Sequence, residues 1–514
     1  MKINIVGGGP AGLYFALLMK KLDPAHEISV LERDPADNTY GWGIVLSGRT
    51  LDSLRGADFE TYREVIRQSQ SWERLEVVHQ GETVSVGGND FSGIKRIRFL
   101  NILQDRCRSL GVKLQFQANV GSLDQASDCD LLVGADGLKS MVREAFRDQL
   151  LTKTEERLNR FIWYGTATPF AGLTMIFRPH EDGLYLAHAY RFEPDMSTFI
   201  VECDPETWRR AGFSRMAEAE TAAYLAEVFR QELQGRPLIS NRSLWGSFLL
   251  VRNVHWHCQN VVLLGDALHS VHFSIGSGTK LAVEDAMALA GSFAQEQSLP
   301  AALKAFERRR KPRVDAFQDA ALDSLLWLEN VQPDIGLDPL PFVYKLMRRS
   351  NRITHRRLKD QDPEFLRRYE AWRWEHEGPI HREFLDLFEK KAYGHLATLL
   401  PDGRPHVTPV YADYDGRHII INSGKGRQKD LNMEQRRLVA LEITDPDKPL
   451  RYLGIQGEVV EITEEGADEH LDKLARRYHD RDRYPPSWRF PGEVRRIYKI
   501  KPLKVIHWDP FGGW

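Results

Sequence analysis

The sequence predicts a mixed α/β protein that ends in a small antiparallel β-barrel, and three observations predict it. The first 35 residues read as strand, glycine turn, helix and strand. Residues 150–255 carry short runs of alternating polarity, and residues from 381 onward carry short strands joined by Asp-Gly turns. A βαβ unit implies a parallel sheet, alternation implies antiparallel strands with one covered face, and closely spaced turns imply a barrel.

Length and charge limit the classes of partner. At roughly 150 residues per domain, a chain of 514 residues is expected to form two or three domains. The net charge of −2 gives no overall field that would attract nucleic acid. No apolar stretch approaches the roughly 18 residues that a membrane span needs. We therefore expect neither nucleic acid nor a membrane as a partner.

Cysteine usage predicts the compartment. Cys107, Cys129, Cys203 and Cys258 lie far apart and form no CxxC pair. This pattern argues against a disulfide framework and against a zinc site, and it fits a reducing cytoplasm. We therefore expect no bound metal. The first residues run straight into a strand pattern, so we expect no signal peptide.

The stretch "MKINIVGGGPAGLYFALL" has the spacing of a dinucleotide-binding turn. Gly7 permits the tight turn, Gly9 lets the backbone approach a pyrophosphate, and Gly12 lets the helix pack close to the strand. Glu32, at the end of the second strand, is placed to accept hydrogen bonds from a ribose. A purely structural glycine turn is the weaker alternative. The residues expected to contact the dinucleotide here are Gly7, Gly9, Pro10, Ala11, Gly12, Glu32 and Arg33.

Two later stretches repeat the strand-to-helix junction. "DLLVGADGLKSMVR" places Asp136 after an apolar strand, and "NVVLLGDALHSVHFSIGSGTKLAVEDAMALA" places Asp266 after another. A glycine loop with Gly276 and Gly278 then opens a helix. Either junction alone could be a strand end with a capping aspartate. Three junctions in this order are much harder to explain in that way.

Together these motifs resemble the single-component FAD-dependent aromatic hydroxylases, the family of p-hydroxybenzoate hydroxylase, over roughly residues 1–375. The resemblance implies a Rossmann-like FAD-binding domain in which the first glycines and Glu32 hold the ADP half of FAD. It places Asp136 beside the pyrophosphate, Asp266 at the ribityl chain and the Gly276 loop along the isoalloxazine ring. Arg98 competes with Arg96 for one flavin contact. The further flavin-contacting residues that the resemblance implies are Arg49, Arg96, Asp136, Gly137, Gly265, Asp266, Gly276, Gly278 and Thr279.

Departures from the general pattern narrow the resemblance. Phe273 stands where the family usually has proline, and Lys280 stands where it usually has asparagine. Stretches such as "GWGIVLSGRTLDSL" and "AHAYRFEPDMSTFIVEC" resemble a smaller group. That group holds salicylyl-CoA 5-hydroxylase, the monooxygenase half of 2-aminobenzoyl-CoA monooxygenase/reductase and the tryptophan-type hydroxylases of violacein synthesis. Its shared substrate is an electron-rich ring, in some members carried as a CoA thioester.

The resemblance implies that NAD(P)H and molecular oxygen are consumed while an aromatic carbon is hydroxylated. It also implies that the antiparallel sheet covers the substrate, so Trp163, Tyr164, His188 and Tyr190 are candidates for the pocket wall. Aromatic residues in strands are more often core, and that alternative stays open.

A base that takes a phenol or amine proton would raise the electron density of the ring. His188, His269 and His272 are candidates, and the sequence does not distinguish them from structural hydrogen-bonding histidines.

Residues 300–378 are helical and charged in pattern. The blocks at 304–313 and 345–359 are strongly basic, which suits a clamp on the phosphates of CoA or a nucleotide. A solvated helix face or an interdomain surface would have the same composition, and we favour this second interpretation. Gly378-Pro379 predicts a boundary between a monooxygenase domain, 1–378, and a second domain, 379–514.

The second domain resembles the pyridoxamine-phosphate-oxidase-like split barrels over roughly residues 381–510. The phrase "NSGKGRQKDLNM" places Ser423, Arg427, Gln428 and Lys429 in one loop before a helix. In that family this loop binds a cofactor phosphate, and the barrel is a homodimer with the cofactor at the interface. The sequence leaves open FMN, a deazaflavin, haem or no cofactor at all.

These features predict a cytoplasmic, FAD-dependent, NAD(P)H-consuming hydroxylase of a small aromatic substrate. The barrel could reduce or oxidise the product. Two alternatives remain from other classes: a barrel that only dimerises, and a front half that is a flavin dehydrogenase or reductase without oxygen activation.

Overall fold

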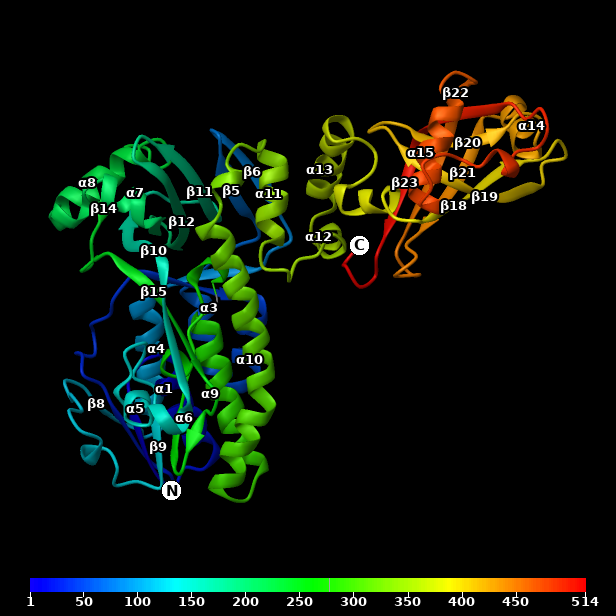
Figure 1. Cartoon of the computed structure of the whole chain (residues 1–514). Helices are drawn as coiled ribbons and strands as arrows, with labels where there is room; N and C mark the ends of the chain where they lie inside the picture. The colour runs from blue at the N-terminus through cyan, green and yellow to red at the C-terminus, as the bar shows by residue number, and fades with distance from the viewer. Residues whose placement is uncertain (277) are drawn as a thin grey trace. The chain divides into compact units, whose positions relative to one another are not determined.

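The computed structural model describes residues 1–276 and 278–514, and the chain divides into two compact units, Met1–Arg352 and Ile353–Trp514 (Figure 1). The division falls before Gly378, because two helices that precede Gly378 group with the barrel unit. They are α12 (His355–Gln361) and α13 (Pro363–His376). A domain boundary at residue 378 stays a prediction.

The first unit begins with a six-stranded sheet in the order β16-β17-β9-β1-β2-β8. Its strands are β1 (Lys2–Val6), β2 (Glu27–Leu31), β8 (Lys113–Gln115), β9 (Leu131–Gly134), β16 (His257–Cys258) and β17 (Val261–Leu263). All neighbouring pairs are parallel except β16 with β17. Ile3 and Ile5 of β1 and Val262 of β17 are fully buried, as expected for a parallel sheet that is covered on both faces.

Helices cover this sheet and build its core. They are α1 (Pro10–Leu22), α4 (Arg96–Ser109), α9 (Gly278–Gln295) and α10 (Leu299–Glu329). Helix α1 contacts both α4 and α9, and α9 contacts α10. Lys20 and Lys21 in the last turn of α1 complement the negative end of its dipole. The predicted strand, glycine turn, helix and strand are therefore present at the expected residues.

A second, eight-stranded sheet roofs the first unit. Its path runs β14-β10-β13-β12-β11-β5-β6, with β15 paired to β10. The strands are β5 (Leu75–His79), β6 (Glu82–Val86), β10 (Thr152–Thr166), β11 (Leu173–His180), β12 (Gly183–Glu193), β13 (Met196–Cys203), β14 (Leu238–Ile239) and β15 (Gly246–Asn253). The predicted antiparallel strands are present, and β5 adds a parallel pairing with β11 from outside the predicted segment.

Alternation gives the second sheet two different faces. One face packs on α7 (Pro205–Arg210) and α8 (Glu218–Val228), and it buries Tyr164, Tyr185 and Phe199 completely. The opposite face carries Trp163 and His188, which both pair with Ile200 across the sheet. Because side chains alternate along a strand, Trp163 and Tyr164 must point to opposite faces.

Smaller elements complete the first unit. A three-stranded sheet runs in the order β3-β7-β4. Its strands are β3 (Gly43–Ser47), β4 (Gln70–Trp72) and β7 (Phe91–Lys95), and the remaining helices are α2 (Gly48–Ala57), α3 (Phe59–Arg67), α5 (Met141–Ala145), α6 (Arg147–Leu150) and α11 (Pro339–Arg348). The "GWG" segment packs tightly, since a Cβ on Gly43 would lie 2.6 Å from the Cβ of Phe192.

The second unit contains a closed barrel in the order β18-β19-β20-β23-β22-β21. Its strands and helices are β18 (Tyr393–Leu399), β19 (Pro405–Tyr414), β20 (Ile419–Gly424), α14 (Gln428–Gln435), β21 (Leu438–Thr444), β22 (Tyr452–Thr463), α15 (Ala467–His479) and β23 (Arg495–Trp508). Leu396, Ile421 and Tyr498 fill the interior. The predicted α/β fold followed by a barrel is confirmed.

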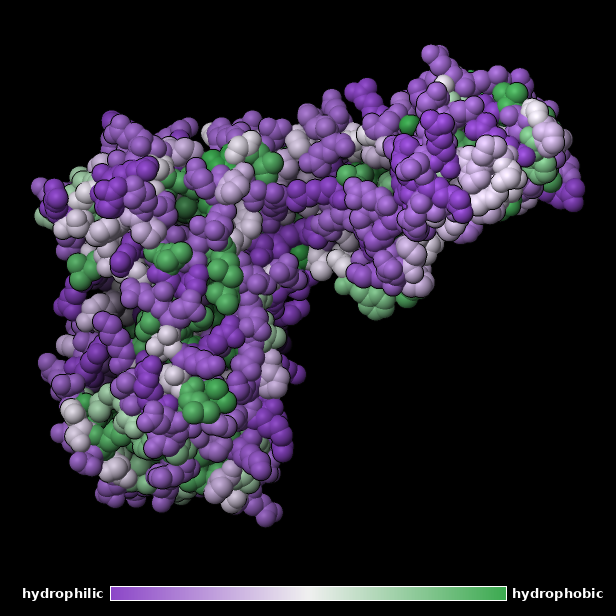
Figure 2. Space-filling model, in the orientation of Figure 1, coloured by the Kyte–Doolittle hydropathy of each residue, from purple (hydrophilic) through white to green (hydrophobic). Residues whose placement is uncertain are grey.

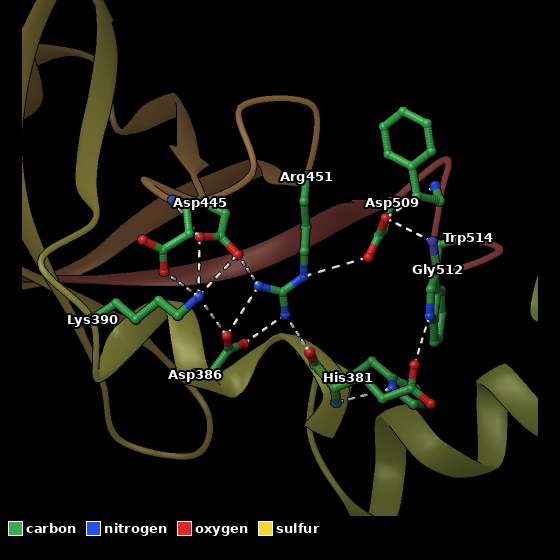
Figure 3. Close-up of polar contacts among 11 residues, drawn as sticks. His381, Asp386, Lys390, Asp445, Arg451, Asp509, Gly512 and Trp514 are labelled. Carbon is green, nitrogen blue, oxygen red and sulfur yellow. Dashed lines mark hydrogen bonds and ion pairs between the residues drawn. The ribbon is translucent and has the colours of Figure 1, made fainter.

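An ionic network ties residues 509–514 to the barrel unit (Figure 3). The buried Arg451 donates to Asp386 at 2.6 Å and to Asp445 at 2.6 Å, and Asp509 accepts the backbone N–H of Gly512 at 2.8 Å. The indole N–H of Trp514 donates to Glu383 at 2.7 Å. A buried arginine is tolerated here because several carboxylates share its charge.

Figure 2 shows hydrophilic side chains over most of the visible face, with apolar side chains in scattered places. Within residues 1–276 and 278–514, no helix combines the length and the apolar character that crossing a bilayer requires.

Candidate functional site

The carboxyl ends of β1, β9 and β17 meet in the first unit and bring the three glycine-containing turns together. A Cβ on Gly7 would lie 2.2 Å from the carbonyl oxygen of Ala135, and one on Gly12 would lie 2.3 Å from the carbonyl oxygen of Gly7. A Cβ on Gly265 would lie 3.0 Å from Ala11. The turns therefore pack so closely that larger residues would force them apart.

The N-terminus of α1 has the features of an anion-binding site. Its capping residue is Gly9, no side chain caps the helix among the described residues, and Pro10 occupies the first turn. A Cβ on Gly9 would meet no atom within 4 Å, so open space lies in front of the backbone N–H groups. Free N–H groups and the positive end of a helix dipole are what a pyrophosphate requires.

Glu32 is half-buried beside this turn. One carboxylate oxygen accepts the N–H of Gly8 at 2.6 Å, and the other accepts the N–H of Asp34 at 2.9 Å. Arg33 is exposed and lies 3.7 Å from Asp34. Two backbone donors fix the Glu32 carboxylate in place, and carboxylate lone pairs remain for a ribose hydroxyl.

Asp136 accepts hydrogen bonds from residues of its own turn. Its carboxylate accepts the Ser140 hydroxyl at 2.5 Å and the N–H of Met141 at 2.7 Å, so it closes the turn that leads into α5. Gly137 has a φ of +79°, which favours glycine at this turn. The capping alternative considered for this junction is thus realised. A contact of Asp136 with a cofactor stays a prediction.

Asp266 and Arg96 lie near each other, and each shifts the pKa of the other. The Asp266 side chain is accessible to solvent, yet the protein around it raises its pKa, partly offset by Arg96 and His269. Burial lowers the pKa of Arg96, while Asp266 and Tyr190 act in the opposite direction. Arg96 also donates to Thr39 at 3.0 Å. An accessible carboxylate surrounded by protein lines an internal hollow rather than the outer surface.

Arg98 and Arg49 lie differently from Arg96. Arg98 is exposed at the start of α4, and Arg49 is exposed on α2. Burial lowers the pKa of Lys280, Glu284 acts in the opposite direction, and Arg49 is among the cations that lower it further. Arg49 and Lys280 therefore place positive charge near the start of α9.

The loop before α9 joins the hollow to the roof sheet. Gly276 has a φ of +58°, α9 begins at Gly278, and Thr279 follows in its first turn. The Arg349 guanidinium donates to the carbonyl of Ser274 at 2.8 Å and to the hydroxyl of Ser324 at 2.8 Å. These bonds anchor the turn that carries Phe273.

Of the candidates for a pocket wall, Trp163, His188 and Tyr190 lie on one face of the roof sheet. Tyr164 is not a wall residue but follows the core alternative, because it is fully buried in the core under α7 and α8. The Trp163 indole N–H has no hydrogen-bond partner among the described residues. The face that carries Trp163, His188 and Tyr190 is therefore aromatic.

A buried carboxylate joins two of the candidate histidines. Glu202 is 1% exposed, accepts the Asn159 amide at 2.8 Å and lies 3.3 Å from Nε2 of His188. Nε2 of His272 lies 3.9 Å from the same carboxylate, and the His188 ring meets Phe273 edge-on at 5.2 Å. Glu202 was not among the residues predicted from the sequence. Its position as a carboxylate inside the apolar strand "STFIVEC" could have indicated it.

The pKa shifts of His272 and Glu202 indicate which of the two groups is charged. Burial lowers the pKa of His272 to about 4. Its Nδ1 accepts the N–H of Ser274 at 3.4 Å, so the proton of the neutral ring is on Nε2, toward Glu202. Burial raises the pKa of Glu202, but His272 and the hydrogen bonds from His188 and Asn159 lower it more. The carboxylate is therefore ionised.

His269 lies apart from this cluster. Its Nε2 is 2.8 Å from Asp285, and Asp285 also accepts Nε of Arg310 at 2.9 Å. All three side chains are buried between α9 and α10. This arrangement suits a structural histidine that is paired with a buried carboxylate, rather than a base at the substrate.

Residues in the two basic blocks pair with carboxylates. Arg310 contacts Glu284 at 2.9 Å, and Lys345 contacts Asp334 at 2.7 Å. Because Arg310 and Lys345 are already paired, they do not support a phosphate clamp.

The barrel loop gathers cations around one carboxylate. Glu493 lies 2.5 Å from Arg427 and 3.2 Å from Arg495. Burial, together with Arg427 and Arg495, lowers the pKa of Lys429 to about 8. Ser423 is 1% exposed, and its hydroxyl has no hydrogen-bond partner among the described residues. Unbalanced positive charge beside an unused buried hydroxyl suits a phosphate.

Gln428 is less suited to that role. Its side-chain amide donates to Asn432 at 2.9 Å, along α14.

Sequence comparisons identify two families along the chain. Residues 1–321 match the FAD binding domain family, and residues 380–509 match the family described as pyridoxamine 5'-phosphate oxidase. The first match spans more than half of the chain. The chain therefore belongs to the FAD binding domain family, and the resemblance predicted from its glycine and aspartate motifs is confirmed.

Two similar relatives carry names of hydroxylation enzymes. Salicyloyl-CoA 5-hydroxylase of a Streptomyces species is 37% identical over 397 residues, which cover 75% of this chain and 76% of the relative. Protodeoxyviolaceinate monooxygenase of Chromobacterium violaceum is 37% identical over 350 residues, covering 67% and 93%.

The name of a third relative mentions a substrate attached to an aryl-carrier protein. The 3-hydroxy-4-methyl-anthranilyl-[aryl-carrier protein] 5-monooxygenase of Streptosporangium sibiricum is 35% identical over 341 residues, covering 66% of this chain and 92% of the relative. Among solved structures, the tetrameric form of 2-methyl-3-hydroxypyridine-5-carboxylic acid oxygenase matches with a TM-score of 0.56 and 17% identity, covering 68% of this chain and 95% of that one. That likeness concerns the fold.

Proposed function

We propose that the chain hydroxylates an electron-rich aromatic ring, using FAD, NAD(P)H and molecular oxygen. The observation that carries the proposal is the position of the His188–Glu202–His272 cluster. It lies on the aromatic face of the roof sheet, against Phe273 of the loop that leads into α9. The names of the relatives support a phenol or aniline substrate, in free form or as an acyl thioester.

The residues of the hollow fit FAD. Gly9 and the N-terminus of α1 would receive the pyrophosphate, Glu32 the ribose and Asp266 the ribityl chain. Arg96 and the N-terminus of α9, with Lys280, would place positive charge near the flavin ring. When bound, FAD takes electrons from NAD(P)H and delivers them to oxygen. The chain's own part is to hold the ring of the substrate in place and to exclude water.

His188 is the proton acceptor in this proposal. Its imidazole lies at the pocket face, and the ionised Glu202 behind it stabilises the positive charge that the ring gains on accepting a phenol or amine proton. Removing that proton makes the aromatic carbon a better nucleophile. His272, neutral at physiological pH, holds Glu202 from the other side as a positioning residue.

Retention of FAD by variants tests the proposed site. Asp266→Ala removes the ribityl contact, and we expect the purified protein to lose FAD on dialysis, as followed by flavin absorbance. Asp182→Ala is a matched control, because Asp182 lies in the distant β11–β12 turn beside Tyr185. An Asp266→Ala protein with full occupancy and full turnover would contradict the assignment.

For the second unit we propose a phosphate-bearing, flavin-type cofactor held by Arg427, Lys429 and Ser423. The uncompensated charge and the unused Ser423 hydroxyl support this role. As the resemblance to the pyridoxamine 5'-phosphate oxidase family implies, two copies of the chain would form a homodimer with the cofactor at the interface. The cofactor would then reduce or oxidise the product of the first unit. The four cysteines are free thiols, which suits a cytoplasmic enzyme.

The double variant Arg427→Ala/Lys429→Ala tests the barrel site in the full chain. We expect it to abolish binding of FMN or a deazaflavin, measured by titration, while the first unit keeps its FAD. Arg404→Ala, an exposed residue of another barrel turn, is the control. An unaltered protein that binds neither compound would leave the barrel as a dimerisation module.

A further inference from the structure

A basic cavity opens in the first unit at the end of β12. It has a volume of about 440 Å³ and is lined by Arg67, Gln70, Lys95 and Arg98, with Glu193 and neighbouring residues. The lining comes from the end of α3, from β4, from the junction of β7 with α4, and from the end of β12. This junction also carries Arg96, so one short segment serves both the flavin hollow and the cavity.

The cavity has more positive than negative charge. Glu193 is its one lining carboxylate, and it pairs with Lys95 at 3.0 Å. Arg67 pairs with Glu64 at 2.7 Å on the surface of α3, a contact that contributes little. Across residues 1–276 and 278–514, the exposed Arg98 forms no ion pair. Arg98 therefore supplies a guanidinium for an anion from outside the protein, and Arg67 is close enough to assist.

Strand β12 links the cavity to the proposed proton acceptor. Lys95 lies 6.0 Å above the ring of Phe192, and the Trp42 ring lies 6.3 Å from the same ring. His188 and Glu193 are five residues apart on β12. At about 3.3 Å per residue, that separation is roughly 17 Å. A small aromatic acid cannot reach both points, whereas an aromatic acyl group on a long anionic arm can.

We propose that this cavity binds the phosphate of a phosphopantetheine arm whose thioester presents the aromatic ring at His188. The inference rests on the proposed function and specifies its substrate class. The arm combines a long polar chain, which suits Gln70 and its neighbours, with a phosphate, which suits the planar fork of Arg98. Coenzyme A and a carrier protein both supply this chemistry.

The test compares probes with and without the phosphate in the FAD-loaded full chain. Calorimetry measures the Kd of salicyloyl-phosphopantetheine and of salicyloyl-pantetheine for the unaltered protein and for Arg98→Glu. We expect Arg98→Glu to weaken only the phosphate-bearing probe, by about tenfold or more, because hydrogen bonds to charged groups are worth about 1.5–3 kcal/mol. Arg230→Glu, an exposed arginine at the end of α8, is the control and should change neither Kd.

Two outcomes would overturn the proposal. Equal weakening of both probes by Arg98→Glu, or equal binding of both probes by the unaltered protein, overturns the proposal. A comparison of salicyloyl-CoA with a salicyloyl carrier protein distinguishes the two sources of the arm. Oxygen uptake and hydroxylated product with saturating salicyloyl-pantetheine, which keeps the thioester but lacks the phosphate, test hydroxylation itself, so failure of the cavity proposal is distinguishable from failure of the proposed function.

Discussion

The carboxylate of Glu202 provides the sharpest test of the proposed proton acceptor. Glu202→Gln keeps the size of the side chain and a hydrogen-bonding group beside His188, but it removes the charge that would stabilise a protonated imidazole. A hydrogen bond to a charged group is worth about 1.5–3 kcal/mol and a neutral one about 0.5–1.5 kcal/mol. The difference, about 1–1.5 kcal/mol, corresponds to a roughly tenfold loss of kcat/KM.

The assay follows oxygen uptake and hydroxylated product together, at equal FAD content, from pH 6 to 10. The deficit should shrink as pH rises through the substrate's own pKa, because an already ionised phenol needs no base. A merely structural role would not produce that pH dependence. Glu442→Gln is the control, since Glu442 forms a similar pair with His395 at 3.0 Å on the exposed surface of the barrel.

Coupling between Glu202 and His188 adds a second criterion. The single variants Glu202→Gln and His188→Gln should be non-additive in the double variant, because Glu202 acts through His188. Additive effects, or a Glu202→Gln enzyme that is unimpaired at every pH, would refute the reasoning.

Two further predictions follow from titrating groups. Lys429 has a pKa of about 8 and is charged below that pH, so the affinity of the barrel for FMN should fall as pH rises through 8. Lys429→Arg should remove this pH dependence, as measured by fluorescence titration of FMN. An unchanged pH dependence in that variant would contradict the prediction. His272 has its pKa lowered from 6.5 to about 4, so the unfolded chain binds a proton that the folded chain does not, and stability falls as pH drops from 6.5 to 4. The folded first unit should lose about 3 kcal/mol of stability over this range. His272→Gln should make the Tm of the first unit less dependent on pH. An equally steep pH dependence in the variant would contradict the lowered pKa of His272.

Local patterns in the sequence were sufficient for much of the fold. The strand, glycine turn and helix around Gly7 obey rules that act within a few residues, where backbone sterics and helix dipoles decide the outcome. The two later junctions, the antiparallel strands and the barrel with its Asp-Gly turns are likewise short-range patterns. For the same reason the family resemblance could be read from motifs alone, and it is confirmed.

Long-range pairing decided the rest. Register places Glu202 beside His188 and near His272, which is 70 positions away in the chain, and no local rule specifies that proximity. It also separates His269 from the other histidines and turns Tyr164 away from the pocket. Strand 75–79 joins the roof sheet through a parallel pairing that its own sequence does not predict. The sequence by itself determined which elements form, because those interactions are local. Only the tertiary structure decided which charges and rings meet, because buried contacts depend on how distant strands align.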